Sequence, residues 1–450
     1  MLLRDAIQTY HDLLTDELAA ASQAQLEVQL RRRGLFFGDR ALCTVLRPRF
    51  ITDEDYRFLA ARCPLLLRAF RKAYEAALAD RAFRAQFGLH DWEEELIPYD
   101  PGFRDPSPTS RLDAFFSPER GELRFSEYNA ETPAAAAYSD VIAEVFYGLP
   151  VMREFMRRYA VRPLPARHGV LHVLLDAYEQ WAGRRVAPRI AILDWREVPT
   201  YSEFVLFADY FAAQGLECVI TDPREVEYTG GRLLAEGRSV DLIYKRVLLS
   251  ELIDRGGRDH PVVRAVRDRA VCMVNPFRCK ILHKKASLAV LSDERNAHLF
   301  DAQERQAIDA HIPWTRRVEE RRTVFRGLPV DLVPLILEHR EQFVLKSNDE
   351  YGGRGITLGW ETDAETWERT VVAAVAEPTV VQERVLLPRE PFPSMIDGRL
   401  QIFDRMLDID PFIVYGAAVE GCITRLSTAS LLNVTAGGGS TNTTFVVERR

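Results

Sequence analysis

Short apolar strands alternate with helices between about residues 165 and 270, and this alternation constrains the fold more than any other feature of the sequence. RIAILDW, from residue 189, is typical of a buried strand, and ECVIT and DLIYKR predict two more, with EYTGGRLLAE as a hairpin between them. A helix is predicted over TYSEFVLFADYFAAQ, where Thr200 and Glu203 would form a capping box and Gly215 would end the helix. The pattern predicts a Rossmann-like α/β unit.

This unit gives no sign of a nucleotide site of its own. No GxGxxG pattern follows its first strand. Ligands of such sheets bind at the carboxyl ends of the strands, where Asp194, Trp195 and Arg196 lie. Two interpretations stay open for these three residues: contact with a substrate, or simple termination of the strand.

The first hundred residues are predicted to be helical. From Tyr56 onward, apolar side chains recur at the spacing of one helix face. Thr52, followed by Asp53, Glu54 and Asp55, supplies an N-cap and an acidic first turn. The segment carries no pattern that indicates chemistry, so we interpret it as scaffold.

Length and composition describe an ordinary globular protein. The 450 residues predict roughly two to four domains. Six scattered cysteines with no CxxC pair disfavour a zinc site or a disulfide framework, and a net charge of -7 gives no electrostatic basis for nucleic-acid binding. The sequence has no run of eighteen apolar residues and no signal-peptide pattern. We therefore expect a cytoplasmic protein that binds neither nucleic acid nor a membrane.

Four polar residues in RLDAFF and RFSEYNAETP form the first candidate site. The two segments flank the turn SPERGE and predict a hairpin. Residues two apart in a strand share a face, so Arg111 and Asp113 would project together, as would Glu127 and Asn129. Carboxylate and amide oxygens suit Mg²⁺, and a neighbouring guanidinium suits a transferring phosphoryl group. The ordinary alternative is a set of surface polar residues on a hairpin.

Three later segments are each compatible with nucleotide binding. In FVLKSNDEYGGRG a strand ends at Lys346 and enters a glycine-rich loop, although the Walker A pattern is absent. TVVQERV is an apolar strand whose backbone can read an adenine edge. In RLSTASLLNVTAGGGS, Arg425 and Asn433 precede three glycines. Taken singly, each segment is equally well a glycine turn or a core strand.

Together, the segments resemble those of ATP-grasp ligases in rotated order. Lys285 in HKKASL precedes HIPWT, then come the Lys346 loop, VVQERV, and Arg425 with its glycines, while the segment that is usually last stands near the N-terminus. This order resembles the circularly permuted, glutathionylspermidine synthase-like ATP-grasp families. SEYNAETP is the most specific match, and the resemblance covers residues 101–450. SNDEYGGRG departs from the family pattern because it is more acidic before its glycines.

The resemblance implies a role for each motif residue. Mg²⁺ would be held by Asp113, Glu127 and Asn129, and Arg111 would stabilise the acyl-phosphate transition state. Arg425 and Asn433 would face the phosphates or the acyl group. The residues expected to contact ATP phosphates are Lys285, Lys346, Gly352, Gly353 and Gly355, with Lys280 as a further candidate. Those expected to border the adenine are Gln382, Glu383 and Val385.

The implied protein is an ATP-dependent carboxylate-amine ligase with an α/β, circularly permuted ATP-grasp fold. Its expected parts are a helical segment (1–100), a metal-binding part (101–160), a Rossmann-like pre-ATP-grasp domain (161–275) and an ATP-binding part (276–450). The substrates would be a small-molecule or peptide carboxylate and an amine, with ATP and Mg²⁺. Alternatives are an ATP-binding regulatory module without turnover and an ATP-dependent phosphotransferase. A nicotinamide-dependent oxidoreductase is disfavoured because the Rossmann-like unit lacks phosphate-binding glycines.

Overall fold

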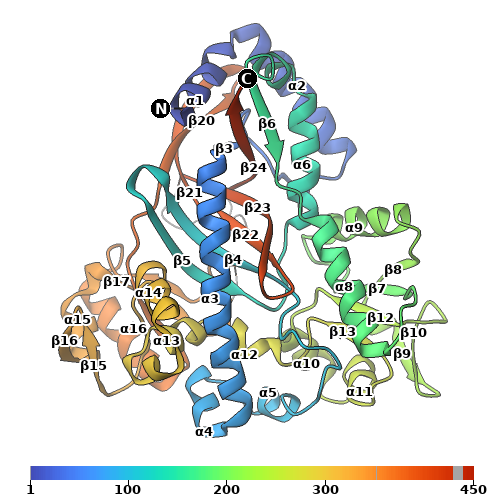
Figure 1. Ribbon diagram of the computed structural model, residues 1–450, viewed down its shortest axis with the longest axis vertical. Helices are drawn as coiled ribbons and strands as arrows, with labels where there is room; N and C mark the ends of the chain where they lie inside the picture. The colour runs from blue at the N-terminus through green and yellow to red at the C-terminus, as the bar shows by residue number, and fades with distance from the viewer. Residues whose placement is uncertain (1, 351, 429–438) are drawn as a thin grey trace.

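The computed structural model describes residues 2–350, 352–428 and 439–450. It has a mixed α/β architecture in which a large, mainly antiparallel sheet stands above two smaller sheets, one to either side (Figure 1). In the described part of the chain, no helix is both long and apolar enough to cross a lipid bilayer.

The large sheet is built from both ends of the chain. Its strands are β3 (Arg49–Ile51), β4 (Thr109–Ser117), β5 (Glu122–Asn129), β6 (Tyr159–Pro163), β20 (Arg389–Ile396), β21 (Arg399–Leu407), β22 (Asp410–Val414), β23 (Ala418–Ser427) and β24 (Ser440–Arg449). They follow the order β20-β21-β23-β22-β4-β5, and β24 pairs with β23, β3 and β6. Early strands therefore lie beside late ones: β4 pairs with β22, and β3 pairs with β24.

Strands β4 and β5 form the hairpin that the sequence predicts. The chain turns at Gly121. Asp113 lies opposite Glu127 and Arg111 lies opposite Asn129, with a register shift directly after Asp113. Such a bulge re-aims neighbouring side chains, and here it falls at the start of the polar set.

Helix α3 (Asp53–Ala79) packs on this hairpin. Thr52 caps it, as predicted, by accepting a hydrogen bond from the backbone of Asp55. The apolar stripe is buried in one core with β4 and β5, where the Phe70 ring lies 4.6 Å from that of Tyr128. The early helical segment therefore shares its core with the predicted site hairpin.

The Rossmann-like unit is present (Figure 1). Its parallel strands are β7 (Ile190–Leu193), β8 (Cys218–Thr221), β12 (Leu242–Lys245) and β13 (Cys272–Val274), in the order β13-β12-β7-β8. Its helices are α8 (Arg167–Ala182), α9 (Tyr201–Ala213), α10 (Leu249–Gly256) and α11 (Pro261–Arg267). A small antiparallel sheet adds β9 (Val226–Thr229), β10 (Arg232–Ala235) and β11 (Arg238–Ser239), which includes the predicted hairpin.

The predicted capping box of α9 is wrong. Thr200 precedes the helix, but its side chain makes no cap hydrogen bond. The Glu203 carboxylate is fully buried instead, where it accepts from the backbone of Ala137 at 3.2 Å and pairs with Arg246 at 3.3 Å. A buried cation outcompetes the local cap because an unpaired charge in the core costs more than an open helix end.

The second small sheet is antiparallel and lies on the other side of the molecule from the Rossmann-like unit (Figure 1). It has the order β14 (Thr315–Arg317), β19 (Thr379–Glu383), β17 (Phe343–Ser347) and β18 (Ile356–Leu358). Helices α15 (Leu332–Glu338) and α16 (Ala364–Ala376) and the hairpin β15 (Arg322–Phe325) with β16 (Leu328–Asp331) accompany it. Trp367 of α16 and Phe343 of β17 are buried in their common core.

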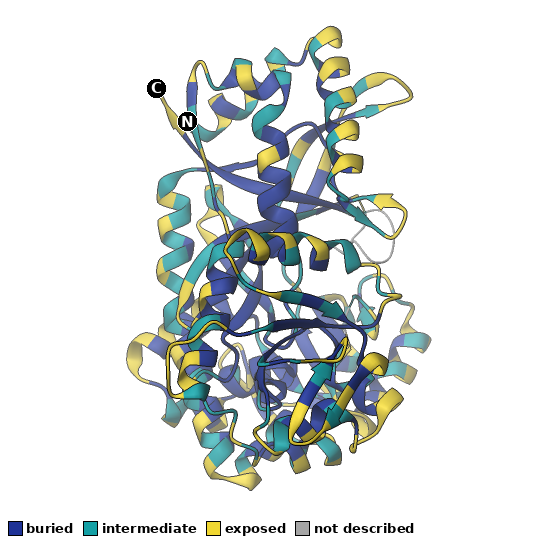
Figure 2. Ribbon diagram, turned by 90° about the vertical axis from the view of Figure 1, so that its right-hand side faces the viewer, coloured by how far each residue is buried: buried dark blue, intermediate teal, exposed yellow. Residues whose placement is uncertain are grey.

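The remaining elements connect and cover these sheets. They are α1 (Leu2–Leu13), α2 (Asp16–Arg32), β1 (Phe36–Phe37), β2 (Arg40–Ala41), α4 (Arg81–Arg84), α5 (Asp91–Leu96), α6 (Ala136–Gly148), α7 (Pro150–Phe155), α12 (Cys279–His283), α13 (Ala286–Ser292) and α14 (Ala302–His311). Figure 2 shows the inner strands largely buried and the exposed residues gathered on outer helices and turns.

Candidate functional site

A cleft lies between the β4–β5 hairpin and the antiparallel sheet that contains β17 and β19. It encloses about 930 Å³, counting the open solvent at its mouth. Its lining residues are Asp113, Ala114, Phe115, Ser126, Glu127, Val344, Lys346, Gly352, Gly353, Ile356, Leu358, Trp360, Gln382, Glu383, Arg384, Val385, Leu387, Asp408 and Arg425. The early acidic hairpin and the late lysine and glycine turns thus face one another across one space.

Lys346 joins the two walls of the cleft. Its ammonium donates to Gln382 Oε1 at 2.8 Å on β19 and to the carbonyl of Ser126 at 3.1 Å on β5. Burial lowers the pKa of Lys346 to about 8, although the carboxylates of Glu127 and Asp113 oppose that shift. A partly buried lysine on the wall of a cleft is well placed to receive an anion.

Asp113 lies between two guanidinium groups. Arg111, two residues earlier on β4, donates from Nε at 2.7 Å and from Nη2 at 3.0 Å, so the two side chains project together as predicted. Arg425 of β23 donates to the same carboxylate at 2.7 Å. Burial by itself raises the pKa of Asp113, but the two arginines outweigh it and hold that pKa below its ordinary value. The carboxylate is therefore charged at neutral pH.

Arg425 has further anionic partners that the sequence analysis did not identify. Its Nε lies 2.8 Å from Asp408 Oδ2 and 3.0 Å from Asp410 Oδ2. Burial raises the pKa of both aspartates, with Arg425 opposing the shift. LDID, with two carboxylates two residues apart among apolar residues where β21 ends and β22 begins, is the signal that could have indicated them.

Glu127 pairs with Lys285, which approaches from the loop before α13. The two charged groups are 2.9 Å apart, and the Lys285 ammonium also donates to the carbonyl of Glu350 at 2.5 Å. Burial raises the pKa of Glu127, but Lys285 and other cations bring it below its usual range. Lys285 therefore connects the acidic hairpin to the start of the glycine turn.

One part of the cleft lining is apolar. Val344, Ile356, Leu358, Val385 and Leu387 line it. Trp360 lies beside them, with the guanidinium carbon of Arg384 4.2 Å from its ring centroid. An apolar slot next to a charged end suits a ligand with an aromatic base and a polyanionic tail.

The side chains of the expected adenine strand are already engaged. Gln382 donates to Thr315 Oγ1 at 3.0 Å and accepts from Lys346, while Glu383 accepts from Arg326 at 2.8 Å. The backbone of this strand is engaged as well, because β19 lies between β14 and β17 and the N–H groups of Glu383 and Arg384 donate to the carbonyls of Trp314 and Gln342.

The other predicted residues lie in several places. Gly355 supports the turn, since its carbonyl accepts from the backbone of Ser347 at 2.9 Å. Lys280 is not among the residues that line the cleft; its ammonium is buried and lies 2.6 Å from Asp349 and 3.1 Å from Glu131. Asn433 lies outside the described residues.

The donor set fits a magnesium ion shared with a nucleotide. Asp113 and Glu127 are directly opposite each other, and the Asn129 amide oxygen is the third oxygen available to a metal. In the described part of the chain the buried amide nitrogen of Asn129 has no hydrogen-bond partner, so it can donate to a phosphate oxygen. Among residues 2–350, 352–428 and 439–450, no group of three or more His, Cys, Asp or Glu side chains is placed to hold a metal by itself. Two carboxylates and one amide leave room for the phosphate oxygens that Mg²⁺ commonly takes as ligands.

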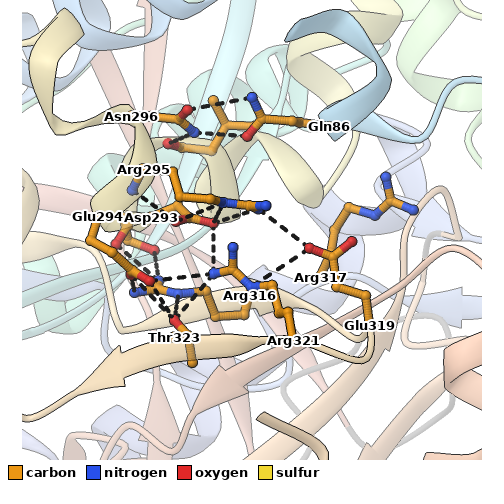
Figure 3. Close-up of polar contacts among 12 residues, drawn as sticks. Gln86, Asp293, Glu294, Arg295, Asn296, Arg316, Arg317, Glu319, Arg321 and Thr323 are labelled. Carbon is orange, nitrogen blue, oxygen red and sulfur yellow. Dashed lines mark hydrogen bonds and ion pairs between the residues drawn. The ribbon is translucent and has the colours of Figure 1, made fainter. Parts of the chain in front are cut away.

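A second hollow lies between the α4 region and the loop before α14, with Gln86, Asp293, Arg295, Arg317 and Glu319 on its wall. Figure 3 shows Arg295 in contact with the carboxylates of Asp293 and Glu319. Arg295 lies 2.8 Å from Asp293 and 3.3 Å from Glu319. These pairs cancel locally, so we assign no site there.

Comparison with known proteins indicates the fold. No protein-family model matches the sequence, and comparison with curated proteins finds no match. The chain is similar to the apo structure of a glutathione synthetase-like effector from Globodera pallida, with a TM-score of 0.64 over 96% of this chain and 98% of that chain at 11% identity. D-alanyl-alanine synthetase A from Vibrio cholerae aligns with a TM-score of only 0.24, over 49% and 66% of the two chains, at 12% identity. The first likeness shows that this chain shares the overall fold of that effector.

Proposed function

We propose that this protein is an ATP-dependent carboxylate-amine ligase with a circularly permuted, glutathionylspermidine synthase-like ATP-grasp arrangement. Residues 101–160 and 276–450 would form the two parts of one nucleotide-binding unit, next to the Rossmann-like part at 161–275 and the helical segment at 1–100. The observation that carries the proposal is the shared cleft: Asp113 and Glu127 line one wall, and Lys346, Gly352 and Gly353 line the other.

The proposed reaction transfers the γ-phosphoryl group of ATP to a substrate carboxylate, with release of ADP. Attack of an amine on the resulting acyl phosphate then forms the amide and releases phosphate. Lys346 would bind the phosphates as a point charge, and the guanidinium groups of Arg111 and Arg425 would stabilise negative charge on the transferring group. Positioning and electrostatics supply most of the acceleration in reactions of this type.

Mg²⁺ would be held by Asp113, Glu127 and Asn129, and it would neutralise phosphate charge when bound. The Asp113 and Glu127 carboxylates are both ionised, because the cations around them lower their pKa. The expected carboxylate substrate is a small molecule or a peptide, and the expected second substrate is an amine. The apolar slot beside Trp360 would take the adenine.

The proposal is tested by measuring ADP release with Mg-ATP and pooled amino acids, small peptides and polyamines. We expect ADP release to depend on both a carboxylate and an amine, and mass spectrometry to detect an amide. A stable phosphate ester instead would indicate a phosphotransferase. Binding of ATP without ADP release in any mixture would indicate a regulatory module.

Asp113→Asn should lower the rate of ADP release about 100-fold or more, because it removes a preorganised charge from the reacting end of the cleft. The matched control is Glu122→Gln, which removes an exposed carboxylate from the same hairpin at the opposite end of β5. Melting temperatures of both variants show whether the fold is intact. Wild-type turnover in a folded Asp113→Asn protein would contradict the assignment of this residue.

A further inference from the structure

The chain is fixed in place just before the glycine turn. The backbone N–H of Lys285 donates to the carbonyl of Asn348 at 2.9 Å, and that of Ala286 donates to the Asn348 side chain at 2.9 Å. On the other side of Asp349, the carbonyl of Glu350 accepts from the Lys285 ammonium. Residues 348–350 are therefore attached to the α12–α13 segment at consecutive positions.

Asp349 is the charged contact in this attachment. Lys280 Nζ lies 2.6 Å from its Oδ1, and Lys284 Nζ lies 2.9 Å from its Oδ2. A separate ammonium group on each oxygen fixes the orientation of the carboxylate as well as its place. Lys280 lies in helix α12, and Lys284 is the residue directly after the end of that helix.

The same two lysines also form ion pairs with carboxylates from other parts of the chain. Lys280 lies 3.1 Å from Glu131, which follows β5, and Lys284 lies 2.8 Å from Glu93 of α5. Glu131 also lies 3.2 Å from Lys245, the last residue of β12. We call the set Glu93, Glu131, Lys245, Lys280, Lys284 and Asp349 the anchor cluster.

The charges of the anchor cluster balance. It contains three carboxylates and three ammonium groups, and burial together with Lys280 lowers the pKa of the adjacent His283 to about 4, which leaves that ring neutral. Cations lower the pKa of Asp349 to about 2 and also depress that of Glu131, in both cases against the effect of burial. The cluster thus has no surplus positive charge for a phosphate, so its lysines are committed to protein carboxylates.

We propose that Asp349 is a positioning residue that ties the turn at residues 352–355 to the anchor cluster and so sets the position of the glycines that face the cleft. Gly352 and Gly353 line the cleft only three and four residues after Asp349. The tie also explains why SNDEYGGRG is acidic before its glycines. Two buried lysines neutralise the Asp349 carboxylate, so it does not repel a nucleotide. The consequence for ATP rests on the proposed function, whereas the tie itself does not.

The tie is tested in the nucleotide-free protein by hydrogen–deuterium exchange. Asp349→Asn should speed deuterium uptake severalfold in peptides that cover residues 344–358, because the segment after β17 loses its ion pairs with Lys280 and Lys284. Glu350→Gln is the matched control, since it removes the same charge one residue later from an exposed side chain. Uptake in Asp349→Asn equal to that of wild type would overturn the proposal, even if the protein never binds ATP.

A second experiment measures the KM for Mg-ATP. Whether Asp349→Asn raises or lowers this KM distinguishes positioning from simple electrostatics. Removing a negative charge near phosphates would strengthen ATP binding if only electrostatics mattered. We expect the opposite for Asp349→Asn: a KM for ATP raised tenfold or more with a smaller change in kcat. Glu350→Gln should change the KM less than twofold. Tighter ATP binding by Asp349→Asn would contradict the proposed role.

A double variant separates positioning from simple destabilisation. Asp349→Asn leaves Lys284 without one of its carboxylates, so the melting temperature should fall. Adding Lys284→Met removes the surplus positive charge that Asp349→Asn leaves in the cluster and should restore the melting temperature, while exchange near the turn and the KM for ATP stay altered. Recovery of both exchange and KM in the double variant would show that Asp349 acts only through stability. If wild-type protein shows no Mg-ATP binding, the proposed function fails, and the exchange result alone decides on the tie.

Discussion

Burial gives Lys346 an ionisation that falls within an accessible pH range. Its ammonium contacts Gln382 and the backbone of Ser126, and the charged groups that face it are Glu127, Asp113 and Lys285. Burial lowers its pKa to about 8, against an ordinary value of 10.5. Because the charged form is the one that attracts phosphate, ATP binding should depend on this ionisation.

We predict that Mg-ATP binding weakens as pH rises above about 8. Above the folded pKa, binding must be accompanied by protonation of Lys346, so the Kd should rise by up to about tenfold per pH unit. Lys346→Arg keeps its charge over this range and should remove the dependence. Isothermal titration calorimetry from pH 7 to about 9.5 measures both profiles. A flat profile for the wild-type protein would contradict the prediction.

At the residue scale, the sequence identifies functional side chains whose partners are only a few residues away in the chain. Arg111 and Asp113 share a strand face, and the structure shows their bidentate contact. The LDID pattern can indicate Asp408 as a candidate, but not its partner, because Arg425 lies on β23 and only the folded sheet brings the two together. The same limit applies to the prediction that Lys280 contacts ATP phosphates, because its position in a motif does not reveal that Glu131 and Asp349 surround its ammonium.

At the scale of elements, the β17–β18 hairpin depends on one close backbone approach. Gly355 has a φ of +64°, and a Cβ added to it would lie 2.6 Å from the Cβ of Ser347. Gly121 in the β4–β5 turn has the same φ, but a Cβ added there meets nothing within 4 Å. Substituting the two glycines therefore distinguishes the cost of a left-handed backbone, which both share, from the cost of a steric contact, which only Gly355 has.

We predict that Gly121→Ala lowers the free energy of unfolding by about 1–2 kcal/mol, the cost of a left-handed alanine. Gly355→Ala should cost more, because Ser347 must also move, and it alone should raise the Kd for Mg-ATP. Urea denaturation and calorimetry on the two variants measure these effects. Equal destabilisation by both substitutions, with unchanged ATP affinity, would contradict the role given to the contact.

Elements themselves are largely predictable here, because hydrophobic spacing and turn residues act locally. The three predicted strands of the Rossmann-like unit, the site hairpin and the Thr52 cap occur where the sequence predicts them, whereas the fourth strand of that unit, β13, was not predicted. The α9 capping box fails because Glu203 has a stronger partner, Arg246, that is distant in sequence. The short strands β3 and β6 were not predicted, because their pairing with β24 supplies the reason for their conformation.

At the scale of the whole molecule, both ends of the chain meet in one sheet. Strand β24 pairs with β23 through its first residues and, further along, lies between β3 and β6, which pair with its opposite edges (Figure 1). Its partners therefore come from the first 163 residues as well as from the last 50. Residues early and late in the chain can face one cleft only because this sheet holds their strands in register.

Deletion of residues 440–450 should therefore abolish cooperative folding and Mg-ATP binding. Phe445, Val446 and Val447 of β24 are at most 1% exposed. Burying each contributes roughly 1.5–3 kcal/mol, so their combined loss rivals the about 5–15 kcal/mol that stabilises a typical domain. Deletion of the exposed residues 448–450 is the control and should leave a single urea transition. A cooperative transition in the longer deletion would show that the early and late strands fold independently, and the shared cleft would then lose its structural basis.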